Sequence, residues 1–225
     1  MKYLQHLALP AALLLAATTV LAQDTASSPA IEPRQVILII GDGMDEQQIT
    51  IARNYLKGAR GRLAMDEMPL RSASQILTIE DKVDGKPVYV ADSANTATSM
   101  ATGEVTSRGR IATSAGNDED IPTIIELAQD SGYRTGIVST ASVTDATPSA
   151  FAAHISFRLC ENPSLIEKIE IKGIELDNCV QDMKKNGGPG SISEQLAKSG
   201  VDVILGGGSK HFAPNAEGTD NSVLD

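Results

Sequence analysis

The residues QVILIIGDGM at positions 35–44 combine an apolar run with a glycine-flanked aspartate. The run from Val36 to Ile40 contains only β-branched residues and leucine, and it ends at Gly41. Such a continuous run predicts a strand that is buried on both faces, as strands are in a parallel sheet. A helix is expected to follow from about Asp45 to Leu56 and to end near Gly58.

The alternation of strands and helices continues along the chain. Strand–helix–strand alternation predicts an α/β fold with a mainly parallel β-sheet flanked by helices. Asp120-Ile121-Pro122 is predicted to open a helix that stops at Gly132 and buries Ile124, Ile125, Leu127 and Ala128. A strand is predicted over Thr135 to Ser139. A helix capped by Ser191 and Glu194 then leads to a buried strand over Val201 to Leu205.

Two stretches show no such pattern. Glu161 to Gly190 is expected to be a long surface excursion, and the polar residues before Asp225 predict no element. A sheet of so few strands is small for a doubly wound architecture. We therefore expect residues 35–225 to be the N-terminal portion of a longer α/β domain.

Residues 1–22 have the composition of a secretory signal peptide. Lys2 supplies a positive n-region, residues 7–20 carry no charge, and Val20-Leu21-Ala22 fits a small-residue cleavage site. We predict cleavage after Ala22, a flexible leader at 23–34, and a periplasmic or secreted protein with no membrane partner. An uncleaved anchor is the alternative, although a span needs about 20 apolar residues.

The charge of the chain limits its partners. The net charge is −10, and it becomes −11 once residues 1–22, which hold one lysine and no acid, are removed. This argues against nucleic acid as a partner, because binding a polyanion requires a basic surface. A small phosphate ester remains compatible, because bound metal ions would supply local positive charge.

The two cysteines, Cys160 and Cys179, give an even count in a chain predicted to be exported. Disulfides persist in oxidising compartments, so this count favours a disulfide, with two free buried thiols as the alternative. A closed loop of about 20 residues would stabilise the fold by roughly 3 kcal/mol in the chain-entropy model.

Asp42 is the first candidate for chemistry. It follows the C-terminal end of a predicted strand, where α/β folds place their ligands. Gly41 and Gly43 allow a tight turn and leave the carboxylate open to a cation. An aspartate that only caps the next helix is the alternative.

Ala91 to Thr102 is a segment in which nine of 12 residues are Ala, Ser or Thr. It predicts a closely packed helix with Asp92 and Ser93 at its N-terminal end. A hydroxyl there faces free backbone N–H groups and the positive end of the helix dipole, which suits a phosphate oxygen. Taken alone, the segment favours Ser93 as a plain N-cap.

A third candidate site follows the strand predicted to end at Ser139. Asp145 and Thr147 can offer a carboxylate and a hydroxyl to one hard cation such as Mg²⁺, and they also suit a helix start. Arg158 is a natural bidentate partner of phosphate, with a surface ion pair as the alternative.

Two histidines follow the signal peptide. The apolar helical setting of His154 favours a structural histidine over a ligand. His211 follows three glycines, and we expect it at the surface. The glycines at 206–208 lack the Lys-Ser/Thr pair of a P-loop.

Together these segments resemble the alkaline phosphatase family, in family order, from about Val36 to His211. Any one motif is weak, whereas five spaced motifs are specific. They are IGDGM at 40–44, ITIARNY at 49–55, ADSANTATSMATG at 91–103, STASVTDATPSAFAAH at 139–154 and ILGGG at 204–208.

The resemblance implies two-step hydrolysis of phosphate monoesters by a homodimer. Ser93 is implied as the nucleophile that becomes phosphoserine, Arg158 as the phosphate clamp, and Asp92 as the acid that holds this arginine. Cys160 and Cys179 match a family disulfide. A serine hydroxyl needs a base or a metal to become a good nucleophile.

The implied cofactors are two Zn²⁺ and one Mg²⁺. Asp42 corresponds to the carboxylate shared between a zinc and the magnesium, and Asp145 and Thr147 correspond to magnesium-side positions. The other zinc ligands of the family come from its C-terminal half, and a catalytic zinc takes three protein ligands. Residues 35–225 alone are therefore expected to bind zinc poorly and to be nearly inactive. Asp45 stands where the family usually has glycine.

Two other hypotheses remain. One is a sulfatase or phosphodiesterase of the same superfamily, although ADSA at 91–94 does not match the sulfatase motif. The other is a non-catalytic exported protein that binds a divalent cation through its carboxylates and phosphate through Arg158.

Overall fold

The computed structural model describes residues 35–171, 174–176 and 179–212. The predicted signal peptide and leader lie outside the described residues. Backbone contacts divide the chain into two units, Met1–Ile40 and Gly41–Asp225. Among the described residues, no helix has the length and apolar character that crossing a membrane requires.

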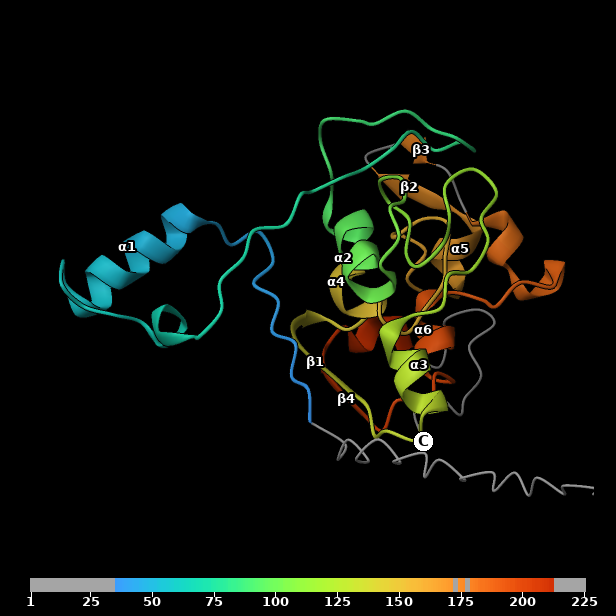
Figure 1. Ribbon diagram of the computed structural model, residues 1–225. Helices are drawn as coiled ribbons and strands as arrows, with labels where there is room; N and C mark the ends of the chain where they lie inside the picture. Colours follow the sequence, from blue (N-terminus) through green and yellow to red (C-terminus); the bar gives the residue numbers. More distant parts are fainter. Residues whose placement is uncertain (1–34, 172–173, 177–178, 213–225) are drawn as a thin grey trace, which may run out of the picture. The chain divides into compact units, whose positions relative to one another are not determined.

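The second unit is built from short helices and short strands (Figure 1). In chain order the elements are α1 (Glu46–Lys57), the 3-10 helix η1 (Ala64–Glu67), α2 (Ser93–Thr102), α3 (Ile124–Asp130), β1 (Gly136–Ser142), α4 (Ala146–Ser149), α5 (Pro163–Glu167), β2 (Ile169–Ile171), β3 (Ile174–Leu176), η2 (Val180–Asp182), η3 (Lys184–Asn186), α6 (Ile192–Leu196), β4 (Val203–Gly207) and η4 (Ser209–Phe212).

Strands β1 and β4 form a parallel pair and lie side by side in Figure 1. Gly136 is opposite Val203, and Ile137 is opposite Ile204. The connection between the two strands contains helices α4, α5 and α6, as a parallel crossover requires. Strands β2 and β3 form a small antiparallel pair. The predicted α/β class, a parallel sheet with flanking helices, is confirmed.

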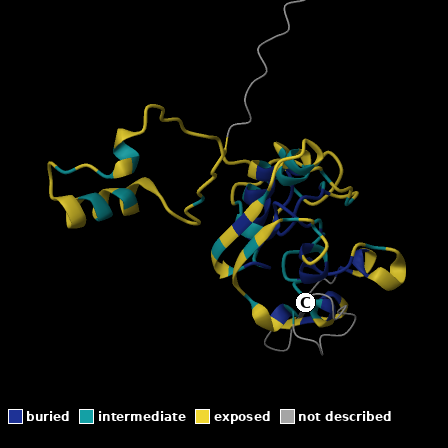
Figure 2. Ribbon diagram, turned by 90° about the horizontal axis from the view of Figure 1, so that it is seen from below, coloured by how far each residue is buried: buried dark blue, intermediate teal, exposed yellow. Residues whose placement is uncertain are grey.

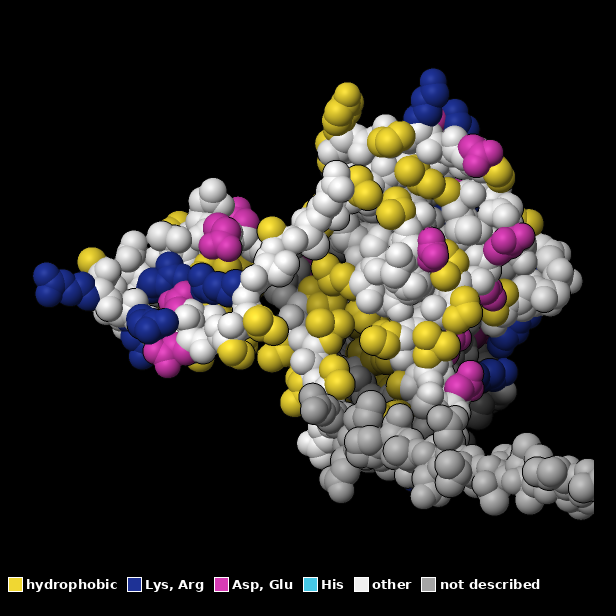
Figure 3. Space-filling view, viewed as in Figure 1, with side chains coloured by type: hydrophobic (Ala, Val, Ile, Leu, Met, Phe, Trp, Pro, Cys, Tyr) yellow, Lys and Arg dark blue, Asp and Glu magenta, His cyan; other side chains and the backbone are white. Residues whose placement is uncertain are grey.

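The predicted burial of the strands is wrong for the described residues. Val36 to Ile40 forms no strand, and the side chain of Leu38 is 58% exposed. On β1, Ile137 is only 8% exposed but Val138 is 75% exposed. Figure 2 shows buried and exposed residues alternating along the ribbon of the second unit. Apolar side chains are also visible on the face shown in Figure 3. An apolar run shows that a segment can be buried. It becomes a strand only if another strand pairs with it, and it is buried only if helices or another sheet pack over it.

The predicted helix α1 is confirmed, with a capping box at its start. Gln48 N donates to Asp45 Oδ1 at 2.9 Å, and Asp45 N donates to Gln48 Oε1 at 2.7 Å. Asp45, at a position where the resemblance leads one to expect glycine, therefore begins the helix as its N-cap. Gly58 ends it, as predicted.

Helix α3 also forms, but its predicted buried face is wrong. Thr123 is its N-cap, one residue after Pro122. Ile124 and Leu127 are each more than half exposed, because in the described chain no layer covers this side of the helix. An amphipathic pattern marks the face that can be buried, and the partner must come from elsewhere in the fold.

The core lies around α2 and α4, which pack against each other. Helix α2 buries Ala94, Ala97 and Ala101, and α4 is followed by the buried Ala150. Small side chains let two helices approach closely, so the Ala/Ser/Thr composition of α2 matches its position. This packing brings the N-terminal residues of α2 and of α4 into one region of the core.

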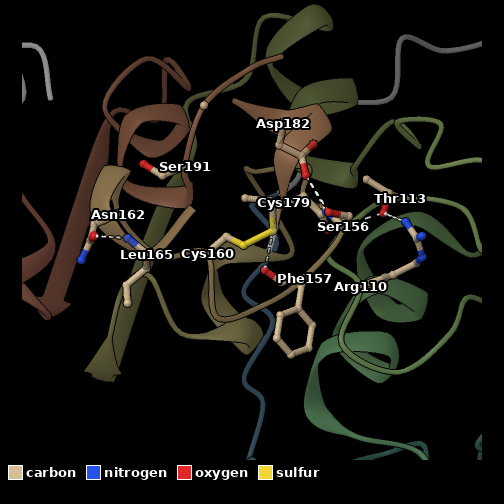
Figure 4. Close-up of a disulfide and its surroundings, with 12 residues drawn as sticks. Arg110, Thr113, Ser156, Phe157, Cys160, Asn162, Leu165, Cys179, Asp182 and Ser191 are labelled. Atoms are coloured by element: carbon tan, nitrogen blue, oxygen red, sulfur yellow. Dashed lines mark hydrogen bonds between the residues drawn. A yellow bond between two sulfur atoms is a disulfide. The ribbon is translucent and has the colours of Figure 1, made fainter. Parts of the chain in front are cut away.

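The predicted surface excursion between Glu161 and Gly190 is only partly correct: among its described residues, Glu167, Lys168, Lys184 and Lys185 are exposed, but others are buried. A disulfide joins its Cys179 to Cys160, the residue before the segment, and both cysteines are fully buried; Figure 4 shows the bond. Ile166 and Met183 are buried as well. The disulfide at Cys160, two residues after Arg158, and these apolar side chains hold the segment against the rest of the fold.

Candidate functional site

The N-terminus of α2 presents Ser93. Asp92 is the N-cap: its Oδ1 accepts from Asn95 N at 3.0 Å, and Asn95 Oδ1 accepts from Asp92 N at 2.8 Å. Ser93 is the first residue of the helix, so a plain N-cap role for Ser93 is wrong. Its hydroxyl is not needed for capping and can face a ligand.

Arg158 reaches Ser93 from a distant segment. Its Nη1 donates to Ser93 Oγ at 2.6 Å, and its Nη2 donates to Asp145 Oδ1 at 3.0 Å. Asp92 Oδ2 lies 3.6 Å from Nη1. The arginine side chain is 24% exposed, so the guanidinium is held between two carboxylates instead of forming a solvated surface pair.

Asp145 accepts from Arg158, and Thr147, two residues later, contacts Asp42. Asp145 is the N-cap of α4, and Thr147 lies within that short helix. Thr147 Oγ1 donates to Asp42 Oδ2 at 2.7 Å. Asp42 stands in a tight turn in which Met44 N donates to Gly41 O and Gly43 has a φ of +69°.

The structure therefore brings all six predicted site residues together. One hydrogen bond joins Asp42 to Thr147, and Arg158 connects Asp145 with the start of α2. The guanidinium and Ser93 provide positive charge and a hydroxyl for an anion. The carboxylates of Asp42 and Asp145, with the Thr147 hydroxyl, provide hard oxygen ligands for a cation.

This set of ligands suits magnesium and not zinc. Mg²⁺ binds through one or two carboxylates and retains several waters, which Asp42, Asp145 and Thr147 can satisfy. Zinc in catalytic sites takes three protein ligands that include nitrogen or sulfur atoms. Within the described ranges, no group of three His, Cys, Asp or Glu side chains could hold a metal ion.

The sequence did not indicate that Glu161, His211 and Asn162 form a cluster next to Thr144, the residue before Asp145. Glu161 Oε2 accepts from the hydroxyl of Thr144 and lies 3.0 Å from His211 Nε2. His211 is 3% exposed, so its predicted surface position is wrong. Asn162 donates to His211 Nδ1 at 3.0 Å, so Nδ1 is the unprotonated ring nitrogen. Burial lowers the pKa of His211, although the Glu161 carboxylate opposes this effect.

His154 has the structural role that its apolar setting indicates. Its Nδ1 lies 2.9 Å from Ala112 O, and its Nε2 lies 2.9 Å from Glu126 Oε1. Both partners accept hydrogen bonds, so the protonated ring, in which both nitrogens donate, satisfies both contacts at once. Burial alone would lower the pKa of His154, but the bonds to Ala112 and Glu126 raise it above its ordinary value.

The fold and the site together define a class: an α/β protein with a serine hydroxyl and an arginine at a helix N-terminus, beside oxygen ligands for a cation. The alkaline phosphatase family model matches residues 33–225. The chain is 45% identical over 208 residues to a streptomycin-6-phosphate phosphatase of Streptomyces griseus, covering 90% of this chain and 44% of that protein. It is 40% identical over 200 residues to an alkaline phosphatase of Escherichia coli K12, covering 88% of this chain and 40% of that protein.

A solved structure gives the same result at the level of the fold. The cold-active alkaline phosphatase from a Shewanella species matches with a TM-score of 0.51 and 28% identity, over 78% of this chain and 36% of that one. The chain belongs to the alkaline phosphatase family. It spans less than half the length of the relatives named above.

Proposed function

We propose that the protein hydrolyses phosphate monoesters, with Ser93 as the nucleophile, as part of the complete enzyme that its gene encodes. The observation that carries this proposal is the hydrogen bond of 2.6 Å from Arg158 Nη1 to Ser93 Oγ at the N-terminus of α2. A phosphate placed there meets a guanidinium, backbone N–H groups and a hydroxyl at once.

The reaction proceeds in two displacements. The Ser93 oxygen bonds to phosphorus as the bond to the ester oxygen breaks, and the proton lost by the Ser93 hydroxyl ends on that ester oxygen, so that the alcohol leaves. Water then attacks phosphorus, which releases inorganic phosphate and restores the Ser93 hydroxyl. Arg158 binds two phosphate oxygens throughout, while Asp92 and Asp145 orient the guanidinium.

Asp42, Asp145 and Thr147 are the residues proposed to hold magnesium. A divalent cation there would offset the negative charge of the phosphate and of the two carboxylates. The described residues offer zinc no set of three ligands from His, Cys, Asp and Glu.

We propose further that the protein is exported and acts as a homodimer. Residues 1–22 have the features of a signal peptide, and the Cys160–Cys179 disulfide fits an oxidising compartment such as the periplasm or the exterior. Localisation of a fusion to an enzyme that is active only outside the cytoplasm tests the first statement, and light scattering of the purified protein tests the second.

Comparative turnover tests the proposed activity. The protein from its complete gene is assayed with an aryl phosphate monoester, an aryl phosphodiester and an aryl sulfate. We expect the monoester to be the preferred substrate and the Ser93→Ala variant to be slower by roughly 10⁴-fold. Preference for the diester or the sulfate would overturn the assignment. Binding of phosphate without turnover would favour the non-catalytic alternative.

A further inference from the structure

Gly109 makes one backbone hydrogen bond to the residue before Ser93 and one to Arg158. Its N–H donates to Asp92 Oδ2 at 3.1 Å. Its carbonyl accepts from Arg158 N at 2.7 Å. The two groups of this one residue therefore hold the N-cap that precedes Ser93 and the backbone that carries the guanidinium.

These bonds close a ring. Arg158 Nη1 donates to Ser93 Oγ, Ser93 follows Asp92 in the chain, and Asp92 accepts from Gly109, which in turn accepts from Arg158. A displacement of Gly109 that pulls on either bond would shift the guanidinium relative to the hydroxyl. A shift of about 1 Å in such a pair can cost roughly a hundredfold in rate.

The residues after Gly109 are bonded both to α2 and to the segment that leads to Arg158. Thr98 of α2 donates to Arg110 O at 3.2 Å and accepts from Ala112 N at 2.9 Å. Ile111 and Ile155 exchange two backbone hydrogen bonds of 3.0 and 2.9 Å. The loop around Gly109 is thus a rigid bridge between α2 and the segment that leads to Arg158.

Two features require glycine at position 109. Its φ is +83°, in the left-handed region that L side chains rarely adopt. An added Cβ would lie 2.9 and 3.0 Å from two ring atoms of Phe157, the residue before Arg158. Figure 4 shows the Phe157 ring pointing away from the disulfide, whose Cys160 lies three residues after Phe157. A side chain at position 109 would therefore press on the segment that carries Arg158.

We propose that Gly109 is a positioning residue for phosphate binding, which acts by holding Asp92 and Arg158 in register with Ser93. The proposal rests on the proposed function. Gly103 provides a matched control, because it also has a positive φ of +81° but a Cβ there meets nothing within 4 Å. Gly103 caps the other end of α2, away from Ser93.

The test is a double-mutant cycle in the protein from its complete gene. Affinity for inorganic phosphate is measured by calorimetry, and KM and kcat are measured with an aryl phosphate, for wild type, G109A, G103A, R158A and G109A/R158A. We expect G109A to weaken phosphate binding at least tenfold and G103A to leave it unchanged. In the R158A background, G109A should have no further effect, because the arginine that it misplaces is absent.

Two outcomes would overturn the proposal: equal effects of G109A and G103A, or an undiminished effect of G109A in the R158A background. If G109A alone does not fold, G109A/F157A removes the ring atoms in the way and is compared with F157A in the same cycle. A wild-type protein that neither binds phosphate nor hydrolyses the ester would refute the proposed function itself. An active wild type with an additive cycle would refute only the role of Gly109.

Discussion

Arg158 and Ser93 are 65 residues apart in the chain, and the arginine Nη1 lies 2.6 Å from the serine Oγ. Three separate constraints produce this contact: the N-cap at Asp92, the bond from Arg158 N to Gly109 O, and the disulfide at Cys160. The side chain is therefore held before any ligand arrives, and a pre-oriented group loses little entropy on binding.

The fork shape of the arginine should matter as much as its charge. Arg158→Lys keeps the charge but loses one of the two arms that reach Ser93 and Asp145. We expect affinity for inorganic phosphate to fall by about tenfold to a hundredfold, since hydrogen bonds to charged groups are worth about 1.5–3 kcal/mol. The measurement is competitive inhibition of aryl phosphate turnover.

Arg62→Lys is the control for that experiment. Arg62 is an exposed arginine whose ion pair with Glu67 spans 3.7 Å, and such pairs contribute little. It should leave inhibition by phosphate unchanged. An Arg158→Lys variant that behaves like Arg62→Lys would show that only the charge at position 158 is needed.

The charge of Asp145 should decide magnesium binding. Asp145→Asn keeps an oxygen that can accept from Ala146 N and from Arg158, so the N-cap and the arginine contact are preserved. We expect the affinity for Mg²⁺ to fall by about 10- to 100-fold. Metal content by mass spectrometry and titration of activity with Mg²⁺ measure this.

Asp130→Asn, at the exposed C-terminal end of α3, is the matched control because it removes one carboxylate charge elsewhere. Equal loss of magnesium in both variants would indicate a general charge effect. Unchanged magnesium affinity in Asp145→Asn would remove Asp145 from the metal site.

The helices show what local sequence can specify. The starts of α1 and α2 are predictable because a cap is an interaction between residues three apart, as in Asp45 with Gln48 and Asp92 with Asn95. The exposure of Val138 is not predictable from the same kind of pattern, because burial depends on a layer that packs from elsewhere.

In the site too, some residues could be predicted from the sequence and others could not. Ser93, Asp145 and Arg158 each allow a plain structural role when taken alone, and only the ordered set of family motifs selected them. Gly109 and His211 were missed for different reasons. The positive φ of Gly109 and its two bonds depend on segments far along the chain, and His211 is buried by Glu161 and Asn162 rather than by its own neighbours.

His154 should make stability depend on pH. The pKa of His154 is raised in the folded state, so the stability gained from its protonation is complete below the unfolded value of about 6.5 and is lost as pH rises through the folded value. The pKa of Glu126 is lowered: burial opposes this, but hydrogen bonds from Thr123 and His154 outweigh it. Glu126 therefore stays charged across this window.

Chemical unfolding of wild type and of His154→Gln at pH 6 and pH 9 measures this effect. The loss of unfolding free energy caused by the substitution should be larger at pH 6, by about 1 kcal/mol. Equal losses at both pH values would mean that the ring does not carry a proton in the folded protein.

Trapping of the covalent intermediate is the most direct test of Ser93 as the nucleophile. The protein from its complete gene is mixed with an aryl phosphate at low pH, quenched in acid, digested and analysed by mass spectrometry. We predict a phosphorylated peptide with the modification on Ser93, absent from the Ser93→Ala variant. Turnover with phosphate on another residue, or turnover that persists in Ser93→Ala at the wild-type rate, would contradict the assignment of Ser93 as the nucleophile.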